Sequence, residues 1–85
     1  MITYEKFSVS PMKVRTIFIK KLLNKMNYNL KEDFYEDKQY KKALKHYQVS
    51  NGFAGNCIIS HDVFYHLINN VHDANSIWNT ILQLR

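Results

Sequence analysis

The sequence predicts a small all-α protein, and three observations support this fold class. The chain has 85 residues, which is enough for one domain with a modest core. It contains only two glycines and one proline, a composition that indicates long regular elements and few tight turns. Apolar side chains recur at three- and four-residue spacing in four segments, as in amphipathic helices. We therefore expect a single helical domain over residues 1–85.

The first predicted helix begins at Ser10-Pro11 and ends near Met26. The serine hydroxyl can cap a free amide, and proline is tolerated in a first helical turn. An apolar stripe is formed by Val14, Ile17, Phe18, Ile19, Leu22, Leu23 and Met26. The opposite side is basic and contains Lys13, Arg15, Lys20, Lys21 and Lys25. No acidic residue interrupts this basic stripe, so it is expected to attract anions.

Three more helices follow. Asp37 is a plausible cap for the second, which ends at Asn51-Gly52 because glycine accepts the left-handed conformation that closes a helix. Ser60 caps the third, and the fourth begins near Asn75. Before the first helix, the segment 2–7 alternates enough to be interpreted as a strand that could join a partner's sheet.

Charge and size limit the function. The formal net charge of +5 favours anionic partners such as nucleic acid, a membrane surface or a cell-wall polymer. Residues 1–45 carry a net charge of +6 and residues 46–85 a net charge of −1. A chain this small has no room for a two-domain active site, so we expect a binding protein and no enzyme. No signal peptide or membrane span is predicted, so we expect synthesis in the cytoplasm without export.

Residues 40–67, YKKALKHYQVSNGFAGNCIISHDVFYHL, carry a resemblance to a known family. Corresponding positions are Ala43-Leu44, Tyr47-Gln48, Asn51-Gly52-Phe53, Asn56-Cys57, Ile58-Ile59, Val63-Phe64 and Leu67. This pattern resembles the small three-helix peptidoglycan-binding domain that is attached to cell-wall hydrolases. Upstream, Met26-Asn27-Tyr28 resembles the exit from that family's first helix, so the likeness covers residues 12–68.

The resemblance implies a three-helix orthogonal bundle over residues 12–68, followed by a short additional C-terminal helix over 73–85. Two departures concern the turns. The family's Asp-Gly turns are replaced by Asp33-Phe34 and by Asn56-Cys57. Because glycine accepts positive φ without a Cβ clash, its absence predicts loops of a different shape.

Tyrosines and amides supply candidates for a sugar-binding groove. An aromatic face can cover a pyranose, and an amide offers both a donor and an acceptor to N-acetyl or peptide groups. The candidate groove residues are Asp33, Tyr35, Tyr40, Tyr47, Gln48 and Asn51, and Tyr28 is a further tyrosine that would suit such a groove. A structural role competes with this one, because Tyr40 and Tyr47 also lie on an apolar stripe and Gln48 could fix the neighbouring loop.

Two features suggest other partners. The C-terminal helix has an apolar face that either covers the core or docks on another protein; it consists of Ile77, Trp78, Ile81 and Leu82. The basic stripe could contact nucleic acid phosphates. Two observations argue against nucleic acid: residues 51–60 are too long for a helix-turn-helix turn, and the third helix has no lysine or arginine.

No metal, cofactor or catalytic group is predicted. The spacing of Cys57, His61, His66 and His72 matches no closed zinc motif. The acidic pairs 32–33 and 36–37 are interpreted as solvated or capping charges. The resemblance without an attached hydrolase suggests a bacteriophage tail or baseplate component that binds peptidoglycan or other virion proteins. The alternatives are an assembly adaptor that lost glycan binding and a basic nucleic-acid-binding protein.

Overall fold

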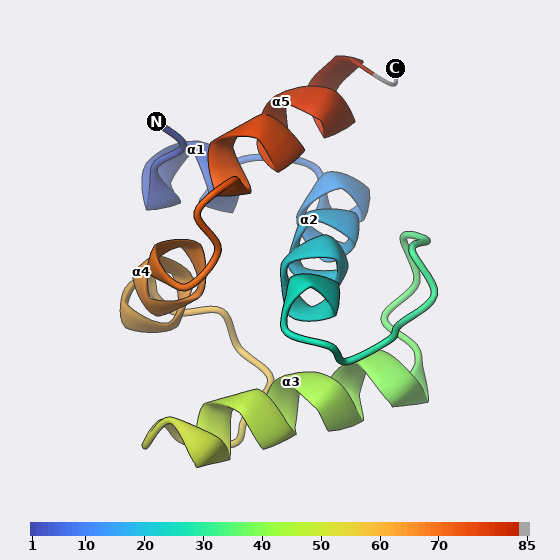
Figure 1. Ribbon diagram of the computed structural model, residues 1–85, viewed down its shortest axis with the longest axis vertical. Coiled ribbons are helices and arrows are strands. Elements are labelled where there is room, and N and C mark those ends of the chain that lie inside the picture. The colour runs from blue at the N-terminus through green and yellow to red at the C-terminus, as the bar shows by residue number, and fades with distance from the viewer. Residues whose placement is uncertain (84–85) are drawn as a thin grey trace.

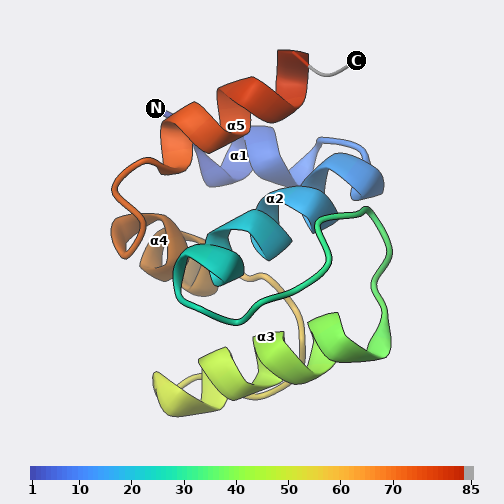
Figure 2. The same ribbon diagram turned by 45° about the vertical axis from the view of Figure 1, so that its right-hand side comes forward.

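Five helices make up the described part of the chain. The computed structural model describes residues 1–83, which contain no strand. The helices are α1 (Tyr4–Ser8), α2 (Met12–Lys25), α3 (Lys38–Ser50), α4 (His61–Asn69) and α5 (Ala74–Gln83). Figure 1 and Figure 2 show α3 and α5 at opposite ends, with α2 and α4 between them. The all-α prediction is confirmed. None of the five helices is long and apolar enough to cross a membrane.

The strand interpretation of residues 2–7 is wrong, because α1 occupies this segment. The Thr3 hydroxyl accepts a hydrogen bond from the Lys6 amide at 3.3 Å and so caps the helix. Phe7 is only 4% exposed and packs against Phe64, with ring centroids 5.0 Å apart. Six residues are too few for alternation to be distinguished from helical spacing, which explains the error.

Two of the predicted helix caps are confirmed and one is wrong. The Asp37 carboxylate accepts from the Tyr40 amide at 2.9 Å, and the Ser60 hydroxyl accepts from the Val63 amide at 3.3 Å. Ser10 does not cap α2. Its hydroxyl donates to the Lys6 carbonyl at 2.7 Å, so this side chain closes α1, and α2 begins directly after Pro11.

All five helices contribute to one core, which therefore extends outside residues 12–68. Trp78 of α5 packs edge-on against Phe18 of α2, with centroids 5.0 Å apart at 79°. Trp78 and Ile81 are each 6% exposed, and Ile77 and Leu82 pack partly buried against the same core. Trp78 and Ile81 are thus covered by the protein itself, whereas Ile77 and Leu82 keep part of their surface exposed. Residues 84–85 of the predicted C-terminal helix lie outside the described residues.

Gln48 fixes the connection between α3 and α4. Its side chain is fully buried and bonds the backbone of the facing loop. Its Oε1 accepts from the Cys57 amide at 2.9 Å, and its Nε2 donates to the Ile58 carbonyl at 3.0 Å. The Gln48 carbonyl also accepts from the Phe53 amide at 2.8 Å, which closes α3. Gln48 therefore has the structural role that competed with ligand binding.

Cys57 adopts a conformation that glycine favours. Its φ is 60°, in the left-handed region, at the position where the resemblance implies a glycine. At this residue the backbone is therefore left-handed although no glycine is present. A residue with a Cβ pays about 1–2 kcal/mol for the left-handed conformation.

At position 57 the glycine variant should consequently be more stable than the alanine variant, which is the reverse of the order expected within a helix. We expect Cys57→Gly to have a free energy of unfolding about 1 kcal/mol above that of Cys57→Ala, because both lose the thiol and only alanine keeps the Cβ clash. Urea unfolding measures this difference. Exposed Asn79 in α5 is the control position, where alanine should exceed glycine by about 1 kcal/mol. Alanine above glycine at both positions would contradict the conformational cost.

Candidate functional site

Two adjacent hollows run along one side of α3 and together form what we call the α3 groove. The larger measures about 390 Å³ and is lined by Met26, Asn27, Tyr28, His46, Tyr47, Asn51 and Asn70. The smaller measures about 230 Å³ and is lined by Tyr28, Leu30, Gln39, Lys42, Ala43 and His46. Tyr28 and His46 belong to both linings, so the two hollows adjoin each other at this pair. From Gln39 to Asn51 the groove follows α3 for about 18 Å.

Tyr28 and His46 form the centre of the groove. The Tyr28 hydroxyl lies 2.9 Å from Nδ1 of His46, and the two rings meet nearly edge to face. Asn27 and Asn29 flank Tyr28 at φ 70° and 59°, left-handed conformations that asparagine tolerates better than most residues. Burial raises the pKa of the Tyr28 phenol, so this group is neutral at physiological pH.

The floor of the larger hollow is a hydrogen-bonded cluster. The Tyr47 hydroxyl bonds Nδ1 of His66, and burial raises the pKa of Tyr47 to about 12. The Asn51 side chain donates to the Tyr47 carbonyl at 2.8 Å, and that of Asn70 donates to the His66 carbonyl at 2.7 Å. Within residues 1–83 no hydrogen bond uses the side-chain carbonyls of Asn51 and Asn70. These oxygens remain as acceptors beside a neutral phenol.

A lysine stripe borders the groove. Lys38, Lys41, Lys42 and Lys45 are exposed and, at spacing i, i+3, i+4 and i+7, share the outer face of α3. None of them forms an ion pair with another described residue. Lys42 also lines the smaller hollow, which places a positive charge at the groove edge.

The basic stripe predicted on α2 is not a free anion-binding surface. Three of its five residues pair with carboxylates, and its remaining members are Lys13 and Arg15. Lys20 is fully buried, with its ammonium 2.5 Å from Asp33 and 3.5 Å from Asp37. The prediction failed because those carboxylates come from residues 32–37 and from Asp73, which are distant in sequence. The free positive surface lies on α3 instead.

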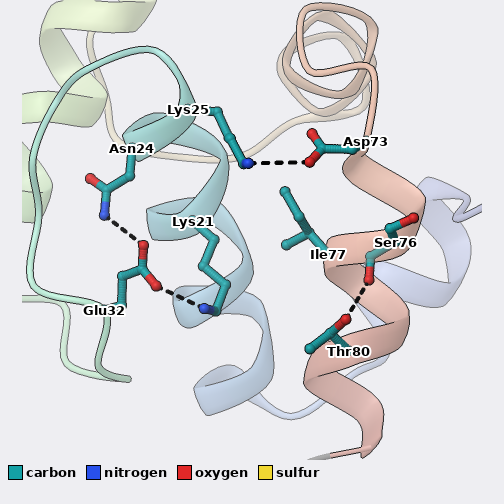
Figure 3. Close-up of a pocket in the computed structure, with 8 residues that line it drawn as sticks. All are labelled: Lys21, Asn24, Lys25, Glu32, Asp73, Ser76, Ile77 and Thr80. Carbon is teal, nitrogen blue, oxygen red and sulfur yellow. Dashed lines mark hydrogen bonds and ion pairs between the residues drawn. The ribbon is translucent and has the colours of Figure 1, made fainter.

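A further hollow, about 530 Å³ and larger than either part of the α3 groove, lies between α2 and α5. In Figure 3, Lys21 reaches Glu32 and Lys25 reaches Asp73, while Ile77 of α5 points toward α2. The ammonium–carboxylate distances are 2.7 Å and 3.2 Å. Because each charge is neutralised within the cleft, we assign ligand binding to the α3 groove rather than to this larger space.

The structure separates the six sequence-predicted groove residues. Tyr47 and Asn51 line the α3 groove. Tyr40 and Gln48 are only 4% and 0% exposed and belong to the interior, outside this groove. Asp33 is held by Lys20, and Tyr35 is 63% exposed on the same connection between α2 and α3, away from the groove lining.

Sequence reasoning missed His46, Asn27 and Asn70. His46 is on the edge of the α3 apolar stripe, two turns after Gln39, and helical spacing alone could have placed these two side chains together. Asn27 and Asn70 follow helices that meet only in the folded chain, so no local pattern indicates them.

The comparisons with known proteins add no relative. No family model, curated protein or solved structure matches the chain. The function is therefore inferred from the residues of the groove and from the sequence pattern over residues 12–68.

Asp33 gives the protein an acid-sensitive contribution to stability. The Lys20 ammonium, helped by a hydrogen bond from the Tyr35 amide, holds the pKa of the Asp33 carboxyl below its usual range. Since the folded pKa lies below the unfolded one, this contribution is complete above about pH 4 and is lost as the pH falls through the folded value. Asp33→Asn should therefore lower the thermal midpoint at neutral pH and leave it unchanged in strong acid.

Two controls assign this effect to the ion pair. Asp62, whose side chain is 87% exposed, has no lysine partner, so Asp62→Asn should change the midpoint less than Asp33→Asn. In a Lys20→Met background, Asp33→Asn should lose most of its effect, as a double-mutant cycle would report. An undiminished effect in that background would contradict the assigned partner.

Proposed function

We propose that the chain is a non-catalytic binding module of peptidoglycan-binding type that takes a glycan strand or its stem peptide along the α3 groove. The observation that carries the proposal is the uncharged polar lining of the larger hollow. Amides from Asn27, Asn51 and Asn70 surround two tyrosines and a histidine there. Amide oxygens can accept from N-acetyl and peptide N–H groups, while aromatic faces cover sugar rings.

The charge of the surrounding surface fits the same ligand. Stem peptides carry carboxylates, and Lys42 lies at the groove edge with the rest of the lysine stripe beside it. These exposed lysines supply long-range attraction, and the neutral floor supplies contacts that salt screens less. The groove lining contains no carboxylate or thiol, whereas glycoside hydrolysis ordinarily uses two carboxylates, so binding without cleavage is the proposed activity.

We place this activity in a bacteriophage tail or baseplate, where a small module would position the particle at the cell wall. The family resemblance over residues 12–68 supports the wall-binding part of this proposal. An assembly adaptor that kept the fold and lost the glycan is the alternative, and retained wall binding separates the two.

Sedimentation with purified peptidoglycan sacculi tests the proposal. We expect the chain to co-sediment, and His46→Ala to weaken binding about tenfold, a loss of about 1.4 kcal/mol. Alanine suits the exposed helical position of His46, so folding should survive. The matched control is Asn79→Ala in α5, at the opposite end of the molecule from α3.

Salt distinguishes groove binding from attraction by charge alone. In about 1 M salt, where the Debye length is about 3 Å, groove contacts should retain part of the binding, and neutralising the lysine stripe to glutamine should matter little. No sedimentation at low salt would remove the wall-binding proposal. Complete loss at high salt, with His46→Ala equal to wild type, would assign the interaction to the lysine stripe alone.

A further inference from the structure

A second hollow, which we call the Arg15 pocket, lies away from the α3 groove. It measures about 300 Å³ and shares none of the groove's lining residues. Segments distant in sequence form its walls: α1, the first half of α2, Glu36, Tyr40 and residues 57–59. Because the pocket and the groove have separate linings, each can be tested without disturbing the other.

Arg15 lines this pocket with an unused donor. Its Nε is buried and has no hydrogen-bond partner, and no described carboxylate lies within ion-pair distance of its guanidinium. A buried donor without a partner is costly, and native proteins rarely keep one without a reason. The planar guanidinium is shaped to bind the two oxygens of a carboxylate.

Large exposed apolar side chains also line the pocket. Met12 is 61% exposed and Ile58 is 62% exposed, although both are residues that usually lie inside proteins. Arginine beside methionine and other large apolar groups is the composition enriched at protein–protein interfaces. Met12 can also adapt its shape to a partner because its side chain is unbranched and flexible.

Glu36 limits which anions the pocket accepts. It lines the same pocket without pairing with Arg15. Because the lining holds the guanidinium of Arg15 and the carboxylate of Glu36, the pocket has no net charge that would attract a polyphosphate. The pocket suits a ligand with one carboxylate and apolar side chains. The carboxylate would bond the guanidinium of Arg15, and the apolar side chains would cover Met12 and Ile58. Tyr40 adds a neutral phenol to the wall, since burial, with a smaller effect of Glu36, raises its pKa.

We propose that the Arg15 pocket is a docking site for a partner protein segment that presents a carboxylate beside apolar side chains. The inference is independent of the proposed wall binding. The carboxylate can be a chain terminus or an acidic side chain, because both offer the same pair of oxygens to the guanidinium.

Nuclear magnetic resonance titration of the full chain tests the proposal with three acetylated peptides. The first is Ala-Leu-Ala-Leu with a free carboxylate, the second is its carboxamide, and the third is the carboxamide of Ala-Leu-Glu-Leu. We expect the first or the third to shift the Arg15 Nε–H signal and the amides of Met12 and Ile58. The plain carboxamide should bind about tenfold more weakly, as expected when a charged hydrogen bond is lost. The peptide that binds better identifies the source of the carboxylate.

Variants locate the interaction. Arg15→Met keeps the apolar stem and should weaken binding of the carboxylate peptides about tenfold, while Glu36→Gln should strengthen it a few-fold by removing a like charge. The far-surface control Asn79→Ala should leave binding unchanged.

Three outcomes would overturn the proposal. The first is an Arg15 signal that no peptide moves at millimolar concentration. The second is equal binding of all three peptides. The third is a set of pocket shifts that appears on concentrating the protein alone, which would assign the pocket to a second copy of the chain.

Discussion

The buried ammonium of Lys20 is the interaction on which the arrangement of α2 and α3 depends. A charge this deep is costly unless it is paired, and its two partners lie on the connection that leads into α3. One of them, Asp37, also caps α3, so the same carboxyl group starts the helix and ties it to α2. The Lys20 ammonium also lies 5.7 Å from the centre of the Tyr40 ring. The two carboxylates offset the cost of burying the lysine, and one of them also fixes where α3 begins.

The placement of α3 determines both proposed interaction surfaces. Its inner face supplies core residues and Gln48, which holds the loop 56–58 and with it the wall of the Arg15 pocket. One flank carries His46 opposite Tyr28, and the outer face carries the lysine stripe. The positive charge of the sequence is thus divided: on α2 it mostly stabilises the fold, and on α3 it stays exposed to solvent. Net charge alone does not distinguish these two uses.

The structural features that depend on neighbouring residues were predicted correctly from local patterns in the sequence. The helical class, the caps at Asp37 and Ser60 and the close of α3 near Gly52 each depend on a few neighbouring residues. Features that join distant segments were missed or misplaced. Lys20 has the spacing of a surface residue, yet it is fully buried and pairs with Asp33 from the following connection. Likewise, the groove combines Tyr28, His46 and Asn70, which belong to three different segments, so only Tyr47 and Asn51 of its residues were among the predicted six.

The position of α3 at the end of the molecule opposite α5 has a consequence for presentation (Figure 1). If the protein were anchored through α1 or α5, the α3 groove and the lysine stripe would lie at the end farthest from the anchor. Orientation would then be set by the fold itself. A single small domain could in this way act as a rigid spacer as well as a binding surface, with its reach fixed by the length of the helices between the two ends.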